Sequence, residues 1–265
     1  YQGVCIGSLI ATPLNLDLLY GEYKPSKFIF DLLQYYRSIL RPQKKQYSNN
    51  IDYEKAKGLP LITFISERDH IFNMSYSIYK ILGYNNVVCL LMNPEILKKM
   101  EIKPLHYLFF DELPKINIRK WRRTSYRLVK SIQNEINSFT KSYGIFGYYR
   151  WRIYSHLALE TKNVQAFIRL INILSPSLIL TEHDRFSYIA SLISVAKRSA
   201  IPTYTMVHGT INNSIGYTPL LADRVFCWGG RQELELIKYG VERKAISITG
   251  APQLHNTRFG DRHEI

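Results

Sequence analysis

Short apolar segments alternate with helical patterns between residues 177 and 252, and this alternation constrains the fold more than any other feature of the sequence. The apolar run Leu178–Leu180 is too short for a helix, and apolar residues at helical spacing follow it from Phe186 to Ala196. The next run, Ile201–Val207, is rich in residues that favour strands. Short strands separated by single helices pair in parallel, with both faces of the sheet covered. The sequence therefore predicts an α/β fold.

The same pattern repeats on both sides of this unit. Downstream, a strand, a helix and a strand are predicted at Arg224–Trp228, Glu233–Tyr239 and Ala245–Thr249. Upstream, the corresponding elements are Leu59–Ile65, Phe72–Leu82 and Asn86–Met92, with Gly83 ending the helix. The other predicted elements are a helix opened by Asn93 and Pro94, a strand at Tyr107–Phe110, an amphipathic helix behind Arg119–Arg123 that continues to Phe139, and a long helix at about Tyr154–Leu174.

The first 56 residues have a different character from the repeated units. The apolar run Tyr1–Ala11 indicates a strand or a leader, and an amphipathic helix from Phe28 to Leu40 suits either core packing or a membrane surface. Arg41–Ala56 is polar and basic, as expected of a linker. We therefore expect an extension at 1–56 packed on the sheet, a Rossmann-like domain at 57–250, and at 251–265 the start of a crossing to a second domain.

The charge of the chain points to an anionic partner. Its 35 Lys and Arg residues exceed its 21 Asp and Glu residues, which gives a net charge of +14. Nucleotide phosphates, lipid head groups and nucleic acid all fit this charge. The densest basic cluster, Arg119–Arg123, suits a solvated helix start, an anionic lipid or acceptor, or a nucleic acid.

Cysteine usage and hydropathy suggest a compartment. The three cysteines, Cys5, Cys89 and Cys227, lie in or beside apolar runs without metal-type spacing, which indicates buried thiols in a reducing environment. No apolar run approaches the roughly 18 residues of a membrane span, and no signal peptide pattern opens the sequence. We expect a cytoplasmic protein whose membrane contact, if any, is peripheral, at the inner face.

Polar or conformationally permissive residues follow each predicted strand. Because ligands of open parallel sheets collect beyond the carboxyl ends of the strands, these positions are the candidate site. They are Ser66–His70, with Arg68 and His70; Thr181–Asp184; His208–Thr210; Trp228–Gly230; and Gly250–Pro252.

The order of these motifs resembles the amino-terminal domain of GT-B-type glycosyltransferases. The similar residues are His208-Gly209-Thr210, then Ala222-Asp223 with Trp228-Gly229, then Gly250-Ala251-Pro252. Bacterial capsule and surface-carbohydrate enzymes and the teichoic-acid glycerophosphotransferases are the most similar in this order. The glycerophosphotransferases usually carry Trp or Gln where this chain has Val207.

The resemblance implies a Rossmann-like, doubly wound parallel sheet that holds the acceptor, while a second domain binds the nucleotide. It implies transfer of a sugar or polyol phosphate from a nucleotide-activated donor to a glycan or lipid-linked acceptor near an anionic membrane surface. The nucleotide sugar is then a co-substrate, and no further cofactor is expected. The seven histidines show no HxH or HExxH spacing, so the sequence indicates no metal site.

The chemistry of such a transfer assigns roles to the candidate residues. A base must reach an acceptor hydroxyl, and His208 suits that role at neutral pH, although a histidine that fixes the turn is the alternative. Glu182, His183 and Asp184 would orient His208 or act as the base, and Asp184 equally suits a helix cap. Gly209 permits close approach of a ligand. Thr210, Asn212 and Asn213 would bind hydroxyls or serve the turn.

Three other functions remain open from the sequence. A non-hydrolysing nucleotide-sugar 2-epimerase shares the two-domain architecture and would release a changed nucleotide sugar without any acceptor. A solitary Rossmann-like domain that binds a glycan or a partner protein would show no turnover. Nucleic-acid binding ranks after these, and a steep salt dependence of duplex binding would reveal it.

Overall fold

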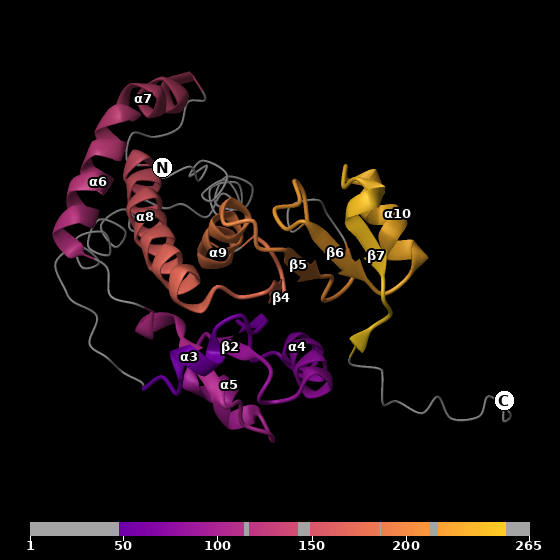
Figure 1. The fold of residues 1–265 in the computed structure, drawn as a ribbon. Coiled ribbons are helices and arrows are strands. Elements are labelled where there is room, and N and C mark those ends of the chain that lie inside the picture. The colour runs from indigo at the N-terminus through magenta and orange to yellow at the C-terminus, as the bar shows by residue number, and fades with distance from the viewer. Residues whose placement is uncertain (1–47, 114–116, 143–148, 186, 212–216, 253–265) are drawn as a thin grey trace, which may run out of the picture.

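The computed structural model describes residues 48–113, 117–142, 149–185, 187–211 and 217–252, which form one seven-stranded sheet with helices on both faces (Figure 1). All neighbouring strands pair in parallel. The strands are β1 Leu61–Phe64, β2 Val88–Leu91, β3 His106–Phe109, β4 Ile179–Thr181, β5 Thr203–Met206, β6 Arg224–Cys227 and β7 Ile246–Ile248. The predicted α/β class with a parallel sheet is confirmed.

The strand order is β3-β2-β1-β4-β5-β6-β7, so the direction of winding reverses between β1 and β4. These two strands are direct neighbours, with Leu61 opposite Ile179 and Ile62 opposite Leu180. This is a doubly wound, Rossmann-like topology, as predicted. Because the connections leave β1 and β4 toward opposite faces, a crevice opens beyond their carboxyl ends, where such sheets bind ligands.

The helices divide between the two faces of the sheet. They are α3 Tyr53–Ala56, α4 Asp69–Leu82, α5 Pro94–Lys99, α6 Ile118–Ser131, α7 Gln133–Ser142, α8 Tyr149–Leu174, α9 Ser187–Arg198 and α10 Gly230–Lys238, with short 3₁₀ turns at Phe110–Glu112 and Arg243–Ala245. Helices α4 and α5 pack on one face, around Phe64 and Leu91. Helices α8 and α9, which lie side by side in Figure 1, and α10 pack on the other.

Several helix boundaries differ from the predictions. Helix α4 begins at Asp69 rather than Phe72, α8 at Tyr149 rather than Tyr154, and α10 at Gly230 rather than Glu233. Their first turns carry polar residues, so apolar periodicity does not reveal them. The single helix predicted as far as Phe139 is divided into α6 and α7.

The described part of the predicted linker contains a short helix. Asp52 caps α3 by accepting a hydrogen bond from the Lys55 N–H at 3.3 Å, and Ala56 is buried in the core beside α8. Asn50 forms an antiparallel bridge with Tyr107. Residues 48–56 are therefore part of the folded unit. The strand and helix predicted within residues 1–47 lie outside the described residues.

The two described cysteines, Cys89 and Cys227, are buried free thiols, as predicted, and burial raises the pKa of each. The prediction for Cys5 lies outside the described residues. Within the described ranges, none of the helices combines the length and the apolar character that crossing a membrane requires.

Candidate functional site

Glu182 joins the ends of the two strands at the switch point. One carboxyl oxygen, Oε2, accepts a hydrogen bond of 2.6 Å from the Ile65 N–H, just beyond β1. The side chain is fully buried at the end of β4. Burial raises the pKa of Glu182 well above its ordinary value, although the Ile65 N–H and the Ser75 side chain act in the opposite direction. Glu182 therefore holds the ends of β1 and β4 together from the protein interior and does not face solvent.

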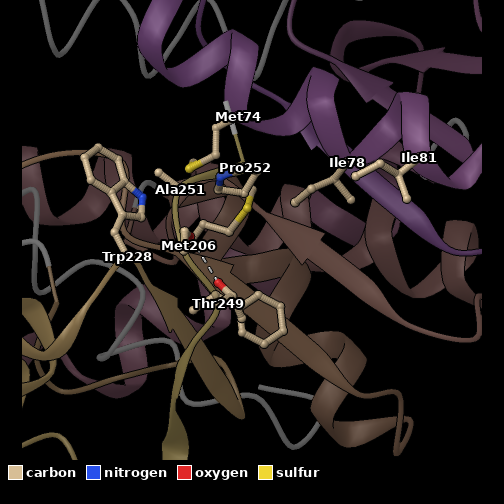
Figure 2. Close-up of a pocket in the computed structure, with 10 residues that line it drawn as sticks. Met74, Ile78, Ile81, Met206, Trp228, Thr249, Ala251 and Pro252 are labelled. Atoms are coloured by element: carbon tan, nitrogen blue, oxygen red, sulfur yellow. Dashed lines mark hydrogen bonds between the residues drawn. The ribbon is translucent and has the colours of Figure 1, made fainter. Parts of the chain in front are cut away.

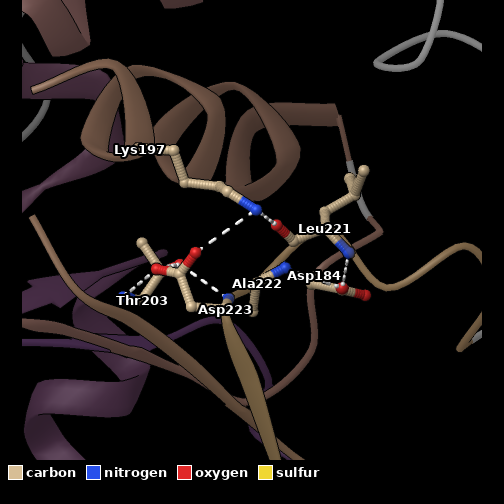
Figure 3. Close-up of polar contacts among 6 residues, drawn as sticks. All are labelled: Asp184, Lys197, Thr203, Leu221, Ala222 and Asp223. Atoms are coloured by element: carbon tan, nitrogen blue, oxygen red, sulfur yellow. Dashed lines mark hydrogen bonds and ion pairs between the residues drawn. The ribbon is translucent and has the colours of Figure 1, made fainter. Parts of the chain in front are cut away.

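Asp184 connects the end of β4 to the loop that precedes β6. Its Oδ2 accepts hydrogen bonds from the Leu221 N–H at 2.6 Å and the Ala222 N–H at 3.2 Å (Figure 3). Its Oδ1 lies 3.4 Å from Nε of Arg185. Burial raises the pKa of Asp184 despite these partners. The helix that Asp184 was predicted to cap starts later than Arg185, at Ser187, and the contacts of Asp184 run to the other loop.

His208 lies at the same edge of the sheet, two residues after β5. Its ring centroid is 6.0 Å from that of His183 and 6.3 Å from that of Tyr217. Burial lowers the pKa of His208, while a backbone hydrogen bond with Glu182 raises it. Burial also lowers the pKa of His183, to about 3. Both imidazoles are therefore neutral at pH 7, and no described residue hydrogen-bonds the buried Nδ1 of His208.

Arg68 and His70 lie near this edge, at the start of α4. Both side chains are exposed, Arg68 at the N-cap position of the helix and His70 in its first turn. Each lowers the pKa of His208 electrostatically. The predicted substrate-binding residues of this loop therefore lie within electrostatic reach of the predicted base.

Replacing Arg68 by glutamine is expected to shift the titration midpoint of His208 to higher pH, because a positive charge that disfavours the imidazolium is removed. The shift can be followed from the His208 ring protons by NMR. Arg198→Gln, at the last residue of α9, is the matched control and should leave the midpoint in place. An unchanged or lowered midpoint in Arg68→Gln would contradict this arrangement.

A side chain of α10 holds the loop after His208, and there is open space beside this loop. The side chain of Gln232 donates to the Gly209 carbonyl at 3.0 Å and accepts from the Trp228 N–H at 2.6 Å. A Cβ atom added at Gly209 would meet no other atom within 4 Å, so a ligand has room beside it. Thr210 is exposed, and the predicted Asn212 and Asn213 lie outside the described residues.

The Ala222-Asp223 motif holds the starts of two neighbouring strands together through hydrogen bonds of Asp223. Asp223 Oδ2 accepts from the N–H and the hydroxyl of Thr203, at 2.9 and 2.7 Å (Figure 3). The Thr203 Oγ1 accepts in turn from the Asp223 N–H at 3.0 Å, and Lys197 lies 3.3 Å from Asp223 Oδ1. Although burial acts in the opposite direction, Thr203 and Lys197 lower the pKa of Asp223. The motif therefore fixes the starts of β5 and β6, at the opposite ends of these strands from His208.

An apolar pocket of about 570 Å³ lies between α4 and the ends of β5, β6 and β7 (Figure 2). Its lining consists of Met74, Ile78, Ile81, Met206, Phe226, Trp228 and the segment 249–252. Met74 follows His70 by one turn of α4, and Met206 precedes His208 by two residues. The pocket therefore lies next to the polar edge of the sheet. Nε1 of Trp228 is buried without a hydrogen-bond partner.

Three features of this site were not among the predicted site residues. Tyr217 lies outside the strand-end motifs, the apolar pocket combines four separate segments, and Arg185 was treated as the start of a helix. The uninterrupted run of polar residues at the end of β4, which continues from Thr181 to Arg185, is the sequence signal that includes Arg185. In the described part of the chain, no three His, Cys, Asp or Glu side chains are grouped so as to hold a metal ion.

Comparisons with known proteins add little to this geometry. No family model and no curated protein matches the chain. Among solved structures, it is similar to UDP-GlcNAc 2-epimerase from Neisseria meningitidis bound to UDP-GlcNAc, with 13% sequence identity and a TM-score of 0.44. The match covers 74% of this chain and 47% of that protein, so this chain spans about half of its length. Roles for individual residues therefore have to come from the geometry of this chain.

Proposed function

We propose that this chain is the acceptor-side domain of a glycosyltransferase of surface-polysaccharide or glycolipid synthesis. The enzyme would transfer a sugar or polyol phosphate from a nucleotide-activated donor to a glycan or lipid-linked acceptor. The observation that supports this best is the state of His208, a neutral imidazole at the switch-point edge with an unpartnered ring nitrogen. The open space at Gly209 beside it supports the proposal further.

The proposed reaction requires one proton transfer by the protein. The imidazole of His208 accepts the proton of the acceptor hydroxyl as the oxygen attacks the anomeric carbon of the donor sugar. The bond from that carbon to the nucleotide phosphate breaks, and the phosphate departs with the bonding electrons. Burial, with Arg68 and His70 nearby, disfavours protonation of His208, and the guanidinium of Arg68 attracts the phosphates electrostatically. In the case of polyol-phosphate transfer, the attack is on phosphorus instead.

Glu182 and Asp184 are given positioning roles in this proposal. Both carboxyls are buried and accept hydrogen bonds from backbone N–H groups, and burial raises the pKa of both. Glu182 also hydrogen-bonds His208 through its backbone. They therefore hold the strand ends, while the proton transfer is left to the imidazole.

The apolar pocket supports a lipid-linked acceptor. Its thioether and aromatic side chains adapt to a flexible hydrocarbon chain. A phosphate attached to that chain would extend toward the cationic start of α4. The donor nucleotide is assigned to a second domain, as in the transferases that the sequence motifs resemble.

The experiment is turnover of the intact protein with a panel of nucleotide sugars, with and without glycan and polyprenyl-phosphate acceptors. Acceptor-dependent appearance of a glycosylated product is expected. A changed nucleotide sugar released without an acceptor would identify an epimerase and overturn the proposal. Binding of sugars without any turnover would instead identify a non-catalytic domain.

A further inference from the structure

Arg185 is a buried cation whose guanidinium lacks good hydrogen-bond partners among the described residues. It follows Asp184 at the end of β4 and is 6% exposed. Its ion pair with Asp184 spans 3.4 Å between Nε and Oδ1, which is longer than a good charged hydrogen bond. Two buried nitrogens of the guanidinium, Nε and Nη2, have no hydrogen-bond partner in the part of the chain that the structure describes.

Such an arrangement is costly unless another group completes it. A guanidinium presents five N–H donors, and leaving buried donors unpaired is unfavourable, more so when the group is charged. Asp184 supplies a negative charge but no good hydrogen bond: its Oδ2 accepts from the Leu221 and Ala222 N–H groups, and its Oδ1 lies 3.4 Å from Nε. Arg185 therefore still lacks a hydrogen-bond acceptor, and an anionic one suits a guanidinium best.

The surroundings of Arg185 indicate which kind of anion fits. Arg185 lies beside the switch point and two residues before the N-terminus of the 12-residue helix α9, where negative charge is favoured. The phenol of Tyr217, near enough for the charge of Asp184 to affect it, is a further donor in this region. The Nε and Nη2 donors of an arginine match two oxygens of a phosphate.

We propose that Arg185 binds a phosphate group of the substrate at the β4–α9 turn. A tetrahedral phosphate supplies one pair of oxygens to Nε and Nη2 and keeps others for neighbouring donors. The 6% of Arg185 that remains exposed lies outside the buried Nε and Nη2, so binding requires the β4–α9 turn to move enough to uncover these two nitrogens. The inference that a phosphate binds here is argued from Arg185 alone. Whether that phosphate belongs to the donor or to the acceptor rests on the proposed function.

Pyrophosphate is the first probe, with binding to the intact protein measured by calorimetry and by the rise in Tm. The wild type is expected to bind it, and Arg185→Met to bind at least about tenfold more weakly, as for loss of a charged bidentate contact. Arg198→Met, at the exposed far end of α9, is the matched control and should bind like the wild type. Absence of binding by the wild type, or equal binding by Arg185→Met, would overturn the inference.

Stability provides a second readout. Arg185→Met leaves the buried Asp184 without its counter-charge, so its Tm without ligand should fall, and pyrophosphate should raise its Tm less than that of the wild type. A purely structural arginine would lower Tm in the same way while pyrophosphate affinity stayed the same, and this result would also reject the inference. Should Arg185→Met fail to fold, Arg185→Lys keeps the charge, loses the two-pronged geometry, and is still expected to bind pyrophosphate several-fold more weakly.

Two further ligands identify the carrier of the phosphate. If Arg185→Met binds a nucleoside diphosphate sugar more weakly than the wild type does, the site belongs to the donor. If it binds farnesyl phosphate more weakly, the site belongs to a lipid acceptor. Sugar transfer without Arg185-dependent pyrophosphate binding would reject this inference alone. Arg185-dependent binding without any transfer would reject the proposed function alone.

Discussion

His208→Ala is expected to lower the rate of sugar transfer by about 10²- to 10⁴-fold, the range that a positioned general base contributes. The imidazole is the neutral group at the switch-point edge with an unpartnered ring nitrogen, and the backbone contact with Glu182 limits its movement. Without it, the acceptor hydroxyl would have to lose its proton to water. The acceptor KM should change much less than kcat, because the deprotonation matters most in the transition state.

Two controls separate this role from a structural one. His208→Gln keeps a polar side chain of similar size but cannot take a proton, so it should be nearly as slow as His208→Ala while unfolding at a temperature close to that of the wild type. Added imidazole should restore part of the activity of His208→Ala. If His208 only fixed the turn, His208→Gln would be active and imidazole would have no effect, and the base assignment would be lost.

The pH dependence of kcat tests the same assignment of His208 as the base. Since burial and the neighbouring positive charges lower the pKa of His208, the acid limb of kcat should lie below the ordinary histidine value. Arg68→Gln should move that limb to higher pH, in step with the NMR midpoint of His208. If Arg68→Gln leaves the acid limb of kcat unchanged, a group other than His208 acts as the base.

Glu182→Gln is expected to be as stable as the wild type at low pH and more stable at high pH. The folded protein holds the Glu182 proton more tightly than the unfolded chain, because burial raises the pKa of this carboxyl. Wild-type stability therefore falls as pH rises from the unfolded-state value of about 4.3 toward the raised folded-state value, by about 1.4 kcal/mol per unit. Glutamine does not titrate and still accepts from the Ile65 N–H.

Glu182→Ala is the matched comparison, since it leaves the buried Ile65 N–H without its acceptor. We expect a loss of about 1–3 kcal/mol at every pH, in addition to any cost of the cavity. Urea unfolding of the three proteins between pH 5 and 8 measures both effects. A constant difference between Glu182→Gln and the wild type across this range would contradict the buried protonated carboxyl. Loss of transfer in a stable Glu182→Gln protein would indicate a chemical role.

The sequence predicted the elements of the site better than their arrangement. Alternating short strands and helices are sufficient to expect a parallel sheet, and a parallel sheet gathers strand ends such as Thr181–Asp184 and His208 on one edge. The pairing of β1 with β4 joins segments separated by more than 100 residues, as the bond between Ile65 and Glu182 shows. Local patterns contain no information about that pairing.

Burial was the other property that the sequence pattern could not supply. Arg185 reads as an exposed residue at the start of a helix, because charged residues are rarely buried. It is nevertheless buried, next to Asp184, whose hydrogen bonds to the Leu221 and Ala222 N–H groups bring a loop distant in sequence to the β4–α9 turn. Likewise, each residue of the apolar pocket suits an ordinary core position, and the cavity exists only once α4 and the ends of β5, β6 and β7 are assembled.

The amide of Gln232 has a mechanical consequence. Its two ends hold the carbonyl of Gly209, next to the proposed base, and the N–H of Trp228, on the wall of the apolar pocket. Because the bond to Trp228 involves its backbone N–H, a hydrocarbon chain that only rotates the indole leaves the bond intact, whereas one that shifts the Trp228 backbone pulls on Gly209 through the same amide. Gln232 therefore connects the wall of the apolar pocket mechanically to the turn that holds the imidazole.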